Sequence, residues 1–193
     1  AWPSIGARGC FMSHLQILRE AAGDDVASVL ILEDDAEMSP AFCSNPERVA
    51  EALVSTGWEY LHGGEVAVER TNAPPRPRPI DPEVGIVGAH FVALAGSRIS
   101  EAASHLEAMA SRMPGSPEGG PMHVDGAYFW FRRARPEMRA ITFSPSLAYQ
   151  RASATDVAPR RWFDRLPVVR AAAGFARRLR NALRRRSPKA NRD

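Results

Sequence analysis

The chain has 193 residues, 45% of them hydrophobic, which is enough to bury the core of one α/β domain. The net charge is only +3, but residues 157–193 contain 12 basic and 2 acidic side chains, so the rest of the chain carries a net charge of −7. The sequence has no apolar run near the roughly 18 residues of a membrane span, no signal peptide and too few cysteines for a disulfide framework. These features argue against a membrane-spanning or disulfide-stabilised protein and predict a cytoplasmic one.

The first predicted element is a helix that begins near Ile5 with Ser4 as its N-cap and ends at Gly23. Its core-facing residues follow the spacing of one helical face: Phe11, Leu15, Leu18 and Ala22. His14 lies on a second, rotated stripe with Cys10. A single histidine on a helix is more often packed or exposed than catalytic, and the cysteines match no zinc or redox spacing. However, this helix leads directly to an acidic cluster.

Residues 29–32 form a continuous apolar run, which predicts a strand buried on both faces, as in a parallel α/β sheet. Three carboxylates follow at once: Glu33, Asp34 and Asp35. Ligands of such sheets bind at the carboxyl ends of the strands, and oxygen ligands suit Mg²⁺, Mn²⁺ or Ca²⁺. The residues alone leave two interpretations open, a divalent metal site or a polar turn of the kind in which aspartate is common.

A second helix is predicted over residues 46–56, with Pro46 in its first turn and Gly57 at its end. Residues 58–62 predict a strand. Gly63 and Gly64 follow it, either as a loop where backbone approaches a ligand or as an ordinary turn.

Residues 71–82 are rich in proline, which excludes helix and central strand and predicts a long loop, either covering a site or inserted without order. After it come a β-like stretch at 85–95 and a helix that begins at Ser97 or Ser100. Residues 141–143 predict a short strand, and residues 144–150 predict a further loop.

Asp125 precedes a strongly aromatic run, residues 128–131, that predicts a buried helix or strand. Two roles for Asp125 are open: a functional acid beside His123, or simply the N-cap of a helix.

The C-terminal segment has the spacing of an amphipathic helix, with basic residues on one side and an apolar stripe on the other: Val168, Ala172, Phe175, Leu179 and Leu183. This pattern is typical of a helix on an anionic membrane surface, with a partner helix, packing on the domain itself and a nucleic-acid patch as alternatives. We favour a membrane or partner over nucleic acid. The predicted organisation is therefore a domain over residues 1–157 and a basic helix with a disordered tail over residues 158–193.

Two stretches resemble the signature of the family 25 glycosyltransferases, which include lipooligosaccharide galactosyl- and glucosyltransferases of Gram-negative bacteria and collagen galactosyltransferases. The family pattern G-C-x-x-S-H, followed by a hydrophobic strand that ends in E-D-D, matches Gly9, Cys10, Ser13, His14, Glu33, Asp34 and Asp35. Weaker matches are residues 58–61 with Gly63 and Gly64, residues 88–92, residues 123–125, and Pro145, Gln150, Ser153 and Asp156.

This resemblance implies a GT-A-like (Rossmann-like) fold with a mixed, mainly parallel sheet flanked by helices, and a UDP-hexose donor. It also implies Mn²⁺ or Mg²⁺ as cofactor, bound by Asp35 and Asp34, with Asp125 as the catalytic base. The residues expected at the donor or acceptor are Ser13, His14, Glu33, Asp34, Gly63, Gly64, Gln150, Ser153 and Asp156.

The implied reaction transfers galactose or glucose to a lipid-linked saccharide in lipopolysaccharide, lipooligosaccharide or other cell-envelope glycan synthesis, by an enzyme that is peripheral on the inner membrane. Members of the family usually begin upstream with a strand and an Arg-rich turn that cradle the nucleotide, and this segment is not in the sequence. A second hypothesis is therefore a non-catalytic glycan- or partner-binding relative that has lost its donor site. A third, a metal-dependent phosphoryl-transfer enzyme or hydrolase, lacks a P-loop and a second acidic motif.

Overall fold

A computed structural model describes residues 1–65 and 71–151. The described residues form five helices: α1 (Ile5–Gly23), α2 (Pro40–Ser44), α3 (Pro46–Thr56), α4 (Arg98–Ser111) and α5 (Val124–Arg133). They form eight strands: β1 (Ser28–Leu32), β2 (Ala36–Met38), β3 (Tyr60–His62), β4 (Gly64–Glu65), β5 (Arg76–Pro79), β6 (Phe91–Ala95), β7 (Ala140–Ser144) and β8 (Ala148–Gln150). The predicted basic helix, the boundary at residue 157, Ser153 and Asp156 lie outside the described residues.

Two sheets organise the described part of the chain. The larger has the strand order β1-β6-β3-β7-β5, and the smaller has the order β2-β8-β4. The expectation of a mainly parallel sheet is wrong, because four of the six pairings are antiparallel and only β3–β7 and β4–β8 are parallel. Strand β6 runs against both of its neighbours, β1 and β3, and the pairs β5–β7 and β2–β8 are antiparallel as well. The α/β class with mixed sheets is confirmed, and it is consistent with a Rossmann-like fold.

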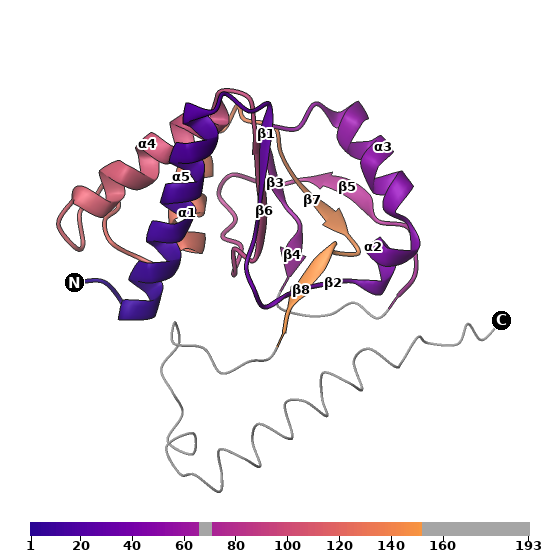
Figure 1. Cartoon of the computed structure of the whole chain (residues 1–193), viewed down its shortest axis with the longest axis horizontal. Coiled ribbons are helices and arrows are strands. Elements are labelled where there is room, and N and C mark those ends of the chain that lie inside the picture. The colour runs from indigo at the N-terminus through magenta and orange to yellow at the C-terminus, as the bar shows by residue number, and fades with distance from the viewer. Residues whose placement is uncertain (66–70, 152–193) are drawn as a thin grey trace, which may run out of the picture.

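Helices cover both faces of the larger sheet, with α1, α4 and α5 on one side and α3 on the other (Figure 1). The interior strand β6 is buried on both faces, because Val92 and Leu94 join the core under α1 and α4 whereas Phe91 and Ala93 join the core under α3. This alternation is what the two-residue period of a strand requires.

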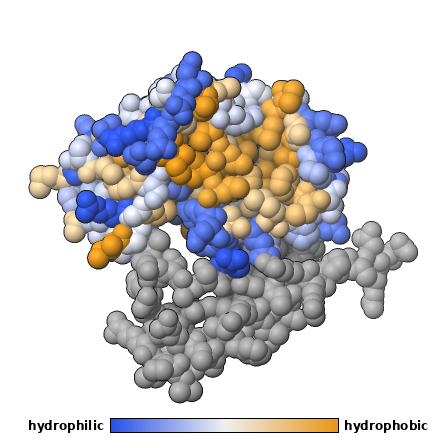
Figure 2. Space-filling model, viewed as in Figure 1, coloured by the Kyte–Doolittle hydropathy of each residue, from blue (hydrophilic) through white to orange (hydrophobic). Residues whose placement is uncertain are grey.

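The strand predicted at residues 29–32 is confirmed as β1, but its burial was predicted wrongly. It is an edge strand that pairs only with β6 among the described strands. Ile31 faces the core, whereas Leu30 and Leu32 are 51% and 46% exposed on the other face. Figure 2 shows an apolar surface over the middle of the molecule, where β1 lies in the same view in Figure 1. An apolar run thus marks a strand with only one covered face.

The predicted helix boundaries are accurate where capping chemistry is strong. The Ser4 hydroxyl accepts a hydrogen bond from the Ala7 N–H at 2.9 Å, which begins α1 at Ile5. Gly57 adopts a left-handed conformation with φ of 58° and ends α3, as predicted. Within residues 1–65 and 71–151, no helix combines the length and hydropathy that a membrane crossing would require.

Two stretches that were predicted as loops contain strands. In the proline-rich segment, β5 pairs with β7 at the edge of the larger sheet, where Pro77 and Pro79 alternate with Arg76 and Arg78. An edge strand tolerates proline because only alternate N–H groups face the neighbouring strand. Toward the end of the described chain, β8 lies between β2 and β4 in the smaller sheet. Because its partners are far away in the sequence, the residues of β8 alone did not predict a strand.

Candidate functional site

A cavity of about 430 Å³ lies where β1 ends, between α1, the beginning of α5 and the end of β8. Seven of the residues that were predicted for the site line this single cavity: Ser13, His14, Glu33, Asp34, Asp35, Asp125 and Gln150. These residues come from four separate parts of the chain. The fold therefore brings together side chains that the sequence could group only by resemblance.

The acidic cluster is held by backbone hydrogen bonds on both sides of the turn after β1. The Glu33 N–H donates to the His90 carbonyl oxygen at 3.1 Å, which extends the β1–β6 ladder by one residue. The Ala36 N–H donates back to the Glu33 carbonyl oxygen at 3.0 Å and closes the turn. The three carboxylates thus occupy a short, fixed turn between β1 and β2.

Residues at the end of β8 and directly after it donate hydrogen bonds to Asp35. The Gln150 side-chain amide donates to Asp35 Oδ2 at 2.9 Å, and the Arg151 N–H donates to the Asp35 carbonyl oxygen at 2.8 Å. Oδ1 of Asp35 is buried and makes no hydrogen bond to any described residue. Burial raises the pKa of Asp35, and the charges of Glu33 and Asp34 add to this effect although Gln150 opposes it.

Glu33 lies against two side chains of α1. Its Oε1 accepts a hydrogen bond from the Cys10 thiol at 3.3 Å and lies 3.4 Å from His14 Nε2. Burial alone would raise the pKa of Glu33, but the contacts with His14 and Cys10 outweigh it and lower the pKa. Burial and the nearby Glu33 carboxylate raise the pKa of the Cys10 thiol to about 12. On the other side of the imidazole, Nδ1 of His14 is 3.1 Å from the Tyr128 hydroxyl.

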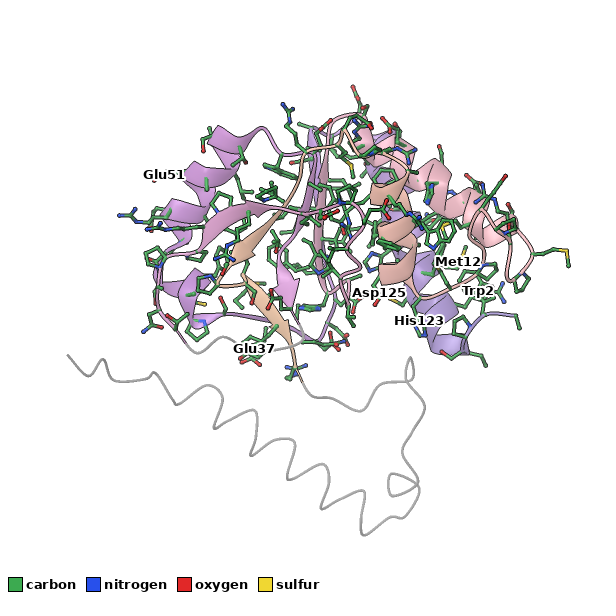
Figure 3. All side chains as sticks on the ribbon, turned by 180° about the vertical axis from the view of Figure 1, so that it is seen from behind. Trp2, Met12, Glu37, Glu51, His123 and Asp125 are labelled. Atoms are coloured by element: carbon green, nitrogen blue, oxygen red, sulfur yellow. The ribbon has the colours of Figure 1, made fainter. Side chains whose placement is uncertain are left out.

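Asp125 lies in the first turn of α5 (Figure 3). His123 is the N-cap residue of this helix, so the alternative that Asp125 is the N-cap is wrong. Oδ2 of Asp125 instead accepts the Gly88 N–H at 2.9 Å, and Oδ1 accepts the Gly126 N–H at 2.7 Å. These two bonds fix the carboxylate at the wall of the cavity.

Gly63 and Gly64 do not line the cavity. A Cβ atom on Gly63 would lie 2.4 Å from the Phe91 ring, and one on Gly64 would lie 2.2 Å from the His90 ring. The two glycines therefore let the backbone pass directly against buried aromatic side chains of β6 and its preceding residue. A ligand contact at these positions stays a prediction that the geometry does not favour.

The spacing of the cysteines assigned Cys10 no metal or redox role and favoured a buried or idle thiol, whereas the structure places Cys10 at the site. The sequence does indicate that Cys10 lies beside His14, because positions 10 and 14 are four residues apart and share one face of a helix. The role of Tyr128 as the partner of His14 had no comparable signal, since 114 positions separate the two residues.

Comparisons with known proteins agree with the motifs at the beginning of the chain. The model of glycosyltransferase family 25 (LPS biosynthesis protein) matches residues 4–70. The chain is 28% identical over 162 residues, 74% of its length, to the mouse (Mus musculus) protein "Inactive glycosyltransferase 25 family member 3". It is 29% identical over 97 residues, 48% of its length, to a "Glycosyltransferase 25 family member" of Aedes aegypti. The resemblance to family 25 is therefore confirmed.

The matches cover only a small part of these relatives. The aligned stretch spans 25% of the mouse protein and 14% of the mosquito protein. The family match includes α1, the acidic turn and α3 but stops before Asp125 and Gln150.

Proposed function

We propose that this chain, whose residues 4–70 match glycosyltransferase family 25, transfers a hexose, galactose or glucose, from a UDP-sugar to a saccharide acceptor. The observation that carries the proposal is the single cavity that gathers the acidic turn, α1 residues, Asp125 and Gln150. A cavity of about 430 Å³ is within the size range of small-molecule sites, and its several polar and acidic side chains suit a polar ligand.

The cation that we expect in this cavity is Mn²⁺ or Mg²⁺, held by Asp35 and Asp34. Both residues offer carboxylate oxygens, which these hard cations prefer. The buried Oδ1 of Asp35 has no hydrogen-bond partner in the described part of the chain, and burial next to other carboxylates raises the pKa of Asp35. A bound cation would give Oδ1 of Asp35 a partner and would stabilise the charged form of its carboxylate. Such a cation supplies neutralisation of the charge that develops on the departing diphosphate.

Asp125 is our candidate for the catalytic base. In a transfer that inverts the anomeric centre, the acceptor oxygen bonds to the sugar carbon as the bond to the diphosphate breaks, and the hydroxyl proton passes to a carboxylate. Asp125 lines the cavity, and the N–H groups of Gly88 and Gly126 hold its carboxylate in place. Ser13, His14 and Gln150 would contact the donor or acceptor from the remaining walls.

Calorimetric titration of UDP, with and without Mn²⁺, tests the donor site. We expect Mn²⁺-dependent binding to the wild-type chain, loss of that binding in Asp35→Asn, and unchanged binding in Glu51→Gln, which removes one charge from the exposed surface of α3. Failure of the folded wild-type chain to bind UDP would contradict the proposal.

Asp125→Asn separates chemistry from donor binding. It should bind UDP as the wild type does, but its rate of hexose transfer should fall by about 10²–10⁴-fold, the usual contribution of a positioned base. An unchanged transfer rate would reject Asp125 as the base.

A second candidate function is non-catalytic binding of a glycan or partner, which is supported by the similarity to the mouse protein named an inactive family member. A chain with this function would bind saccharide without releasing UDP from any UDP-hexose. An assay of UDP release with UDP-galactose and UDP-glucose distinguishes it from the enzyme.

The acceptor that we propose is a lipid-linked saccharide, supported by the description of the matching family as an LPS biosynthesis protein. The excess of basic residues at 157–193 favours attachment to an anionic membrane surface. Flotation with anionic vesicles should recover the full chain but not a chain that ends at residue 159, and equal recovery would exclude this segment as the anchor.

A further inference from the structure

Cys10, His14 and Glu33 place a thiol, an imidazole and a carboxylate around one point. Cys10 and His14 lie one turn apart on α1, and Glu33 faces them from the residue after β1. One ligand atom from each of the three side chains lies within 4.8 Å of the others. We propose that these three residues form a binding site for a zinc-class divalent ion, separate in its ligands from the carboxylates of Asp34 and Asp35.

Two of the three separations between ligand atoms fit a tetrahedral ion, and the third, between the Cys10 thiol and His14, lies within 4.8 Å. Zinc bonds of about 2.3 Å to sulfur and 2.0–2.1 Å to nitrogen or oxygen place neighbouring ligand atoms roughly 3.3–3.6 Å apart. Glu33 Oε1 is 3.3 Å from Cys10 Sγ and 3.4 Å from His14 Nε2. The carboxylate therefore needs almost no movement to share an ion with either neighbour.

The imidazole of His14 is oriented to act as a metal ligand. Its side chain is 3% exposed, and its buried Nε2 makes no hydrogen bond within the described residues, although it points toward Glu33. The other ring nitrogen, Nδ1, is 3.1 Å from the Tyr128 hydroxyl. An Nδ1–H that donates to this hydroxyl leaves the Nε2 lone pair directed at the proposed ion. Such outer partners of ligating histidines fix both ring orientation and tautomer.

The donor set determines which ion is bound. Thiolate and imidazole select zinc and similar borderline ions, whereas Mg²⁺ and Mn²⁺ prefer oxygen ligands alone. Binding converts the Cys10 thiol to a thiolate, so one proton is released to solvent for each ion bound, and no electrons are exchanged. All three side chains line the cavity, which gives an ion a path of entry to them.

This inference does not depend on the proposed transferase activity, because it rests only on the three ligands. Cobalt substitution provides a direct probe, since Co²⁺ bound to a thiolate has a near-ultraviolet charge-transfer absorption that carboxylate sites lack. We expect the wild-type chain to bind one Co²⁺ with this band and to lose the band when Zn²⁺ is added. Zn²⁺ should also protect Cys10, but not the exposed Cys43, from alkylation.

Single substitutions test which side chains bind the ion. Cys10→Ser should lower the Zn²⁺ affinity at least about 100-fold in competition with a chromophoric chelator, and Tyr128→Phe should lower it about 10-fold. Cys43→Ser is the matched control and should bind as the wild type does. Asp35→Asn should retain Zn²⁺ binding while it loses Mn²⁺-dependent UDP binding, so the two proposals can fail separately.

The proposal would be overturned by a wild-type cobalt complex without the thiolate band, or by alkylation of Cys10 at the same rate with and without Zn²⁺. Both measurements use the wild-type chain, so they decide the question even if Cys10→Ser fails to fold.

Discussion

Gln150 donates its side-chain amide to Asp35 at 2.9 Å, although the two residues are 115 positions apart. The contact follows from the register of the smaller sheet, in which Gln150 of β8 is opposite Ala36 of β2, the residue after Asp35. The smaller sheet therefore connects the acidic turn to the last described strand, and it places one neutral donor among three carboxylates.

Gln150→Ala removes this donor. We expect Mn²⁺-dependent UDP binding to weaken about 10-fold, because groups that orient a metal-binding carboxylate typically contribute 10- to 100-fold in affinity. Calorimetric titration measures the change. Gln16→Ala is the matched control, since Gln16 is exposed on α1 and its amide bonds only to the exposed Glu20 among the described residues. Equal binding by both variants would show that Gln150 does not orient Asp35 for a cation.

Asp35→Asn should stabilise the protein at neutral pH in the absence of metal. The folded-state pKa of Asp35 is raised by burial and by Glu33 and Asp34, so the folded state holds this proton to a higher pH than the unfolded state does. The wild-type chain therefore loses stability as the pH rises from below the ordinary carboxyl pKa through the raised value. The asparagine variant does not titrate and keeps this stability.

Thermal unfolding measured from pH 4 to pH 7 in a chelating buffer checks this expectation. The Tm of Asp35→Asn should rise relative to the wild type as the pH increases, whereas the Tm difference of Glu51→Gln, a charge removal on the surface of α3, should stay nearly constant. A Tm difference for Asp35→Asn that shrinks with rising pH would contradict the sign of the pKa change.

The parts of this fold that the sequence predicts best are those that local chemistry determines. Ser4 and Gly57 mark the ends of α1 and α3 because a capping hydroxyl and a left-handed glycine act within one turn of the chain. The acidic turn was predictable for the same reason, since apolar strand residues and carboxylates are adjacent in the sequence.

The parts that could not be predicted depend on pairing between distant segments. The exposure of Leu30 depends on which strands the helices of the other layer cover, and no residue near Leu30 determines this; among the described residues, the core under α3 contains no residue of β1. The strand β8 forms because β2 and β4 lie on either side of it, although its own residues read as a loop. The contact between Gln150 and Asp35 depends on that same pairing.

Glu59→Gln should destabilise the protein, because Glu59 belongs to an ion-pair cluster directly before the first residue of β3. Glu59 accepts the Arg139 N–H at 2.8 Å and the Arg98 Nε–H at 3.1 Å, and these groups, the backbone N–H first, hold the pKa of Glu59 below its usual range. A lowered carboxyl pKa contributes stability above the ordinary carboxyl pKa, and this stability is lost as the pH falls through the lowered value. We expect a loss of about 1 kcal/mol at pH 7, which corresponds to a Tm lower by about 2–4 °C.

Denaturant unfolding of Glu59→Gln at pH 7 and at pH 3 measures this contribution, and the difference from the wild type should shrink at the lower pH. The matched control is Glu107→Gln, which breaks the pair with Arg19 on the surface, where both side chains are more than 40% exposed. Its effect should be below about 0.5 kcal/mol. Equal effects of the two variants would show that burial of the Glu59 cluster adds nothing.

Gly64→Ala tests whether this glycine serves packing. The added Cβ would lie 2.2 Å from the ring of His90, which is fully buried and cannot rotate away without displacing its neighbours. Overpacking of this kind typically costs about 1–3 kcal/mol, which denaturant unfolding resolves. Gly9→Ala is the control, since its Cβ would meet nothing within 4 Å and should stabilise α1 by about 0.5–1 kcal/mol. In a His90→Ala background the cost of Gly64→Ala should largely disappear, because the clashing ring is gone. A cost that persists there would assign Gly64 a role other than accommodating His90.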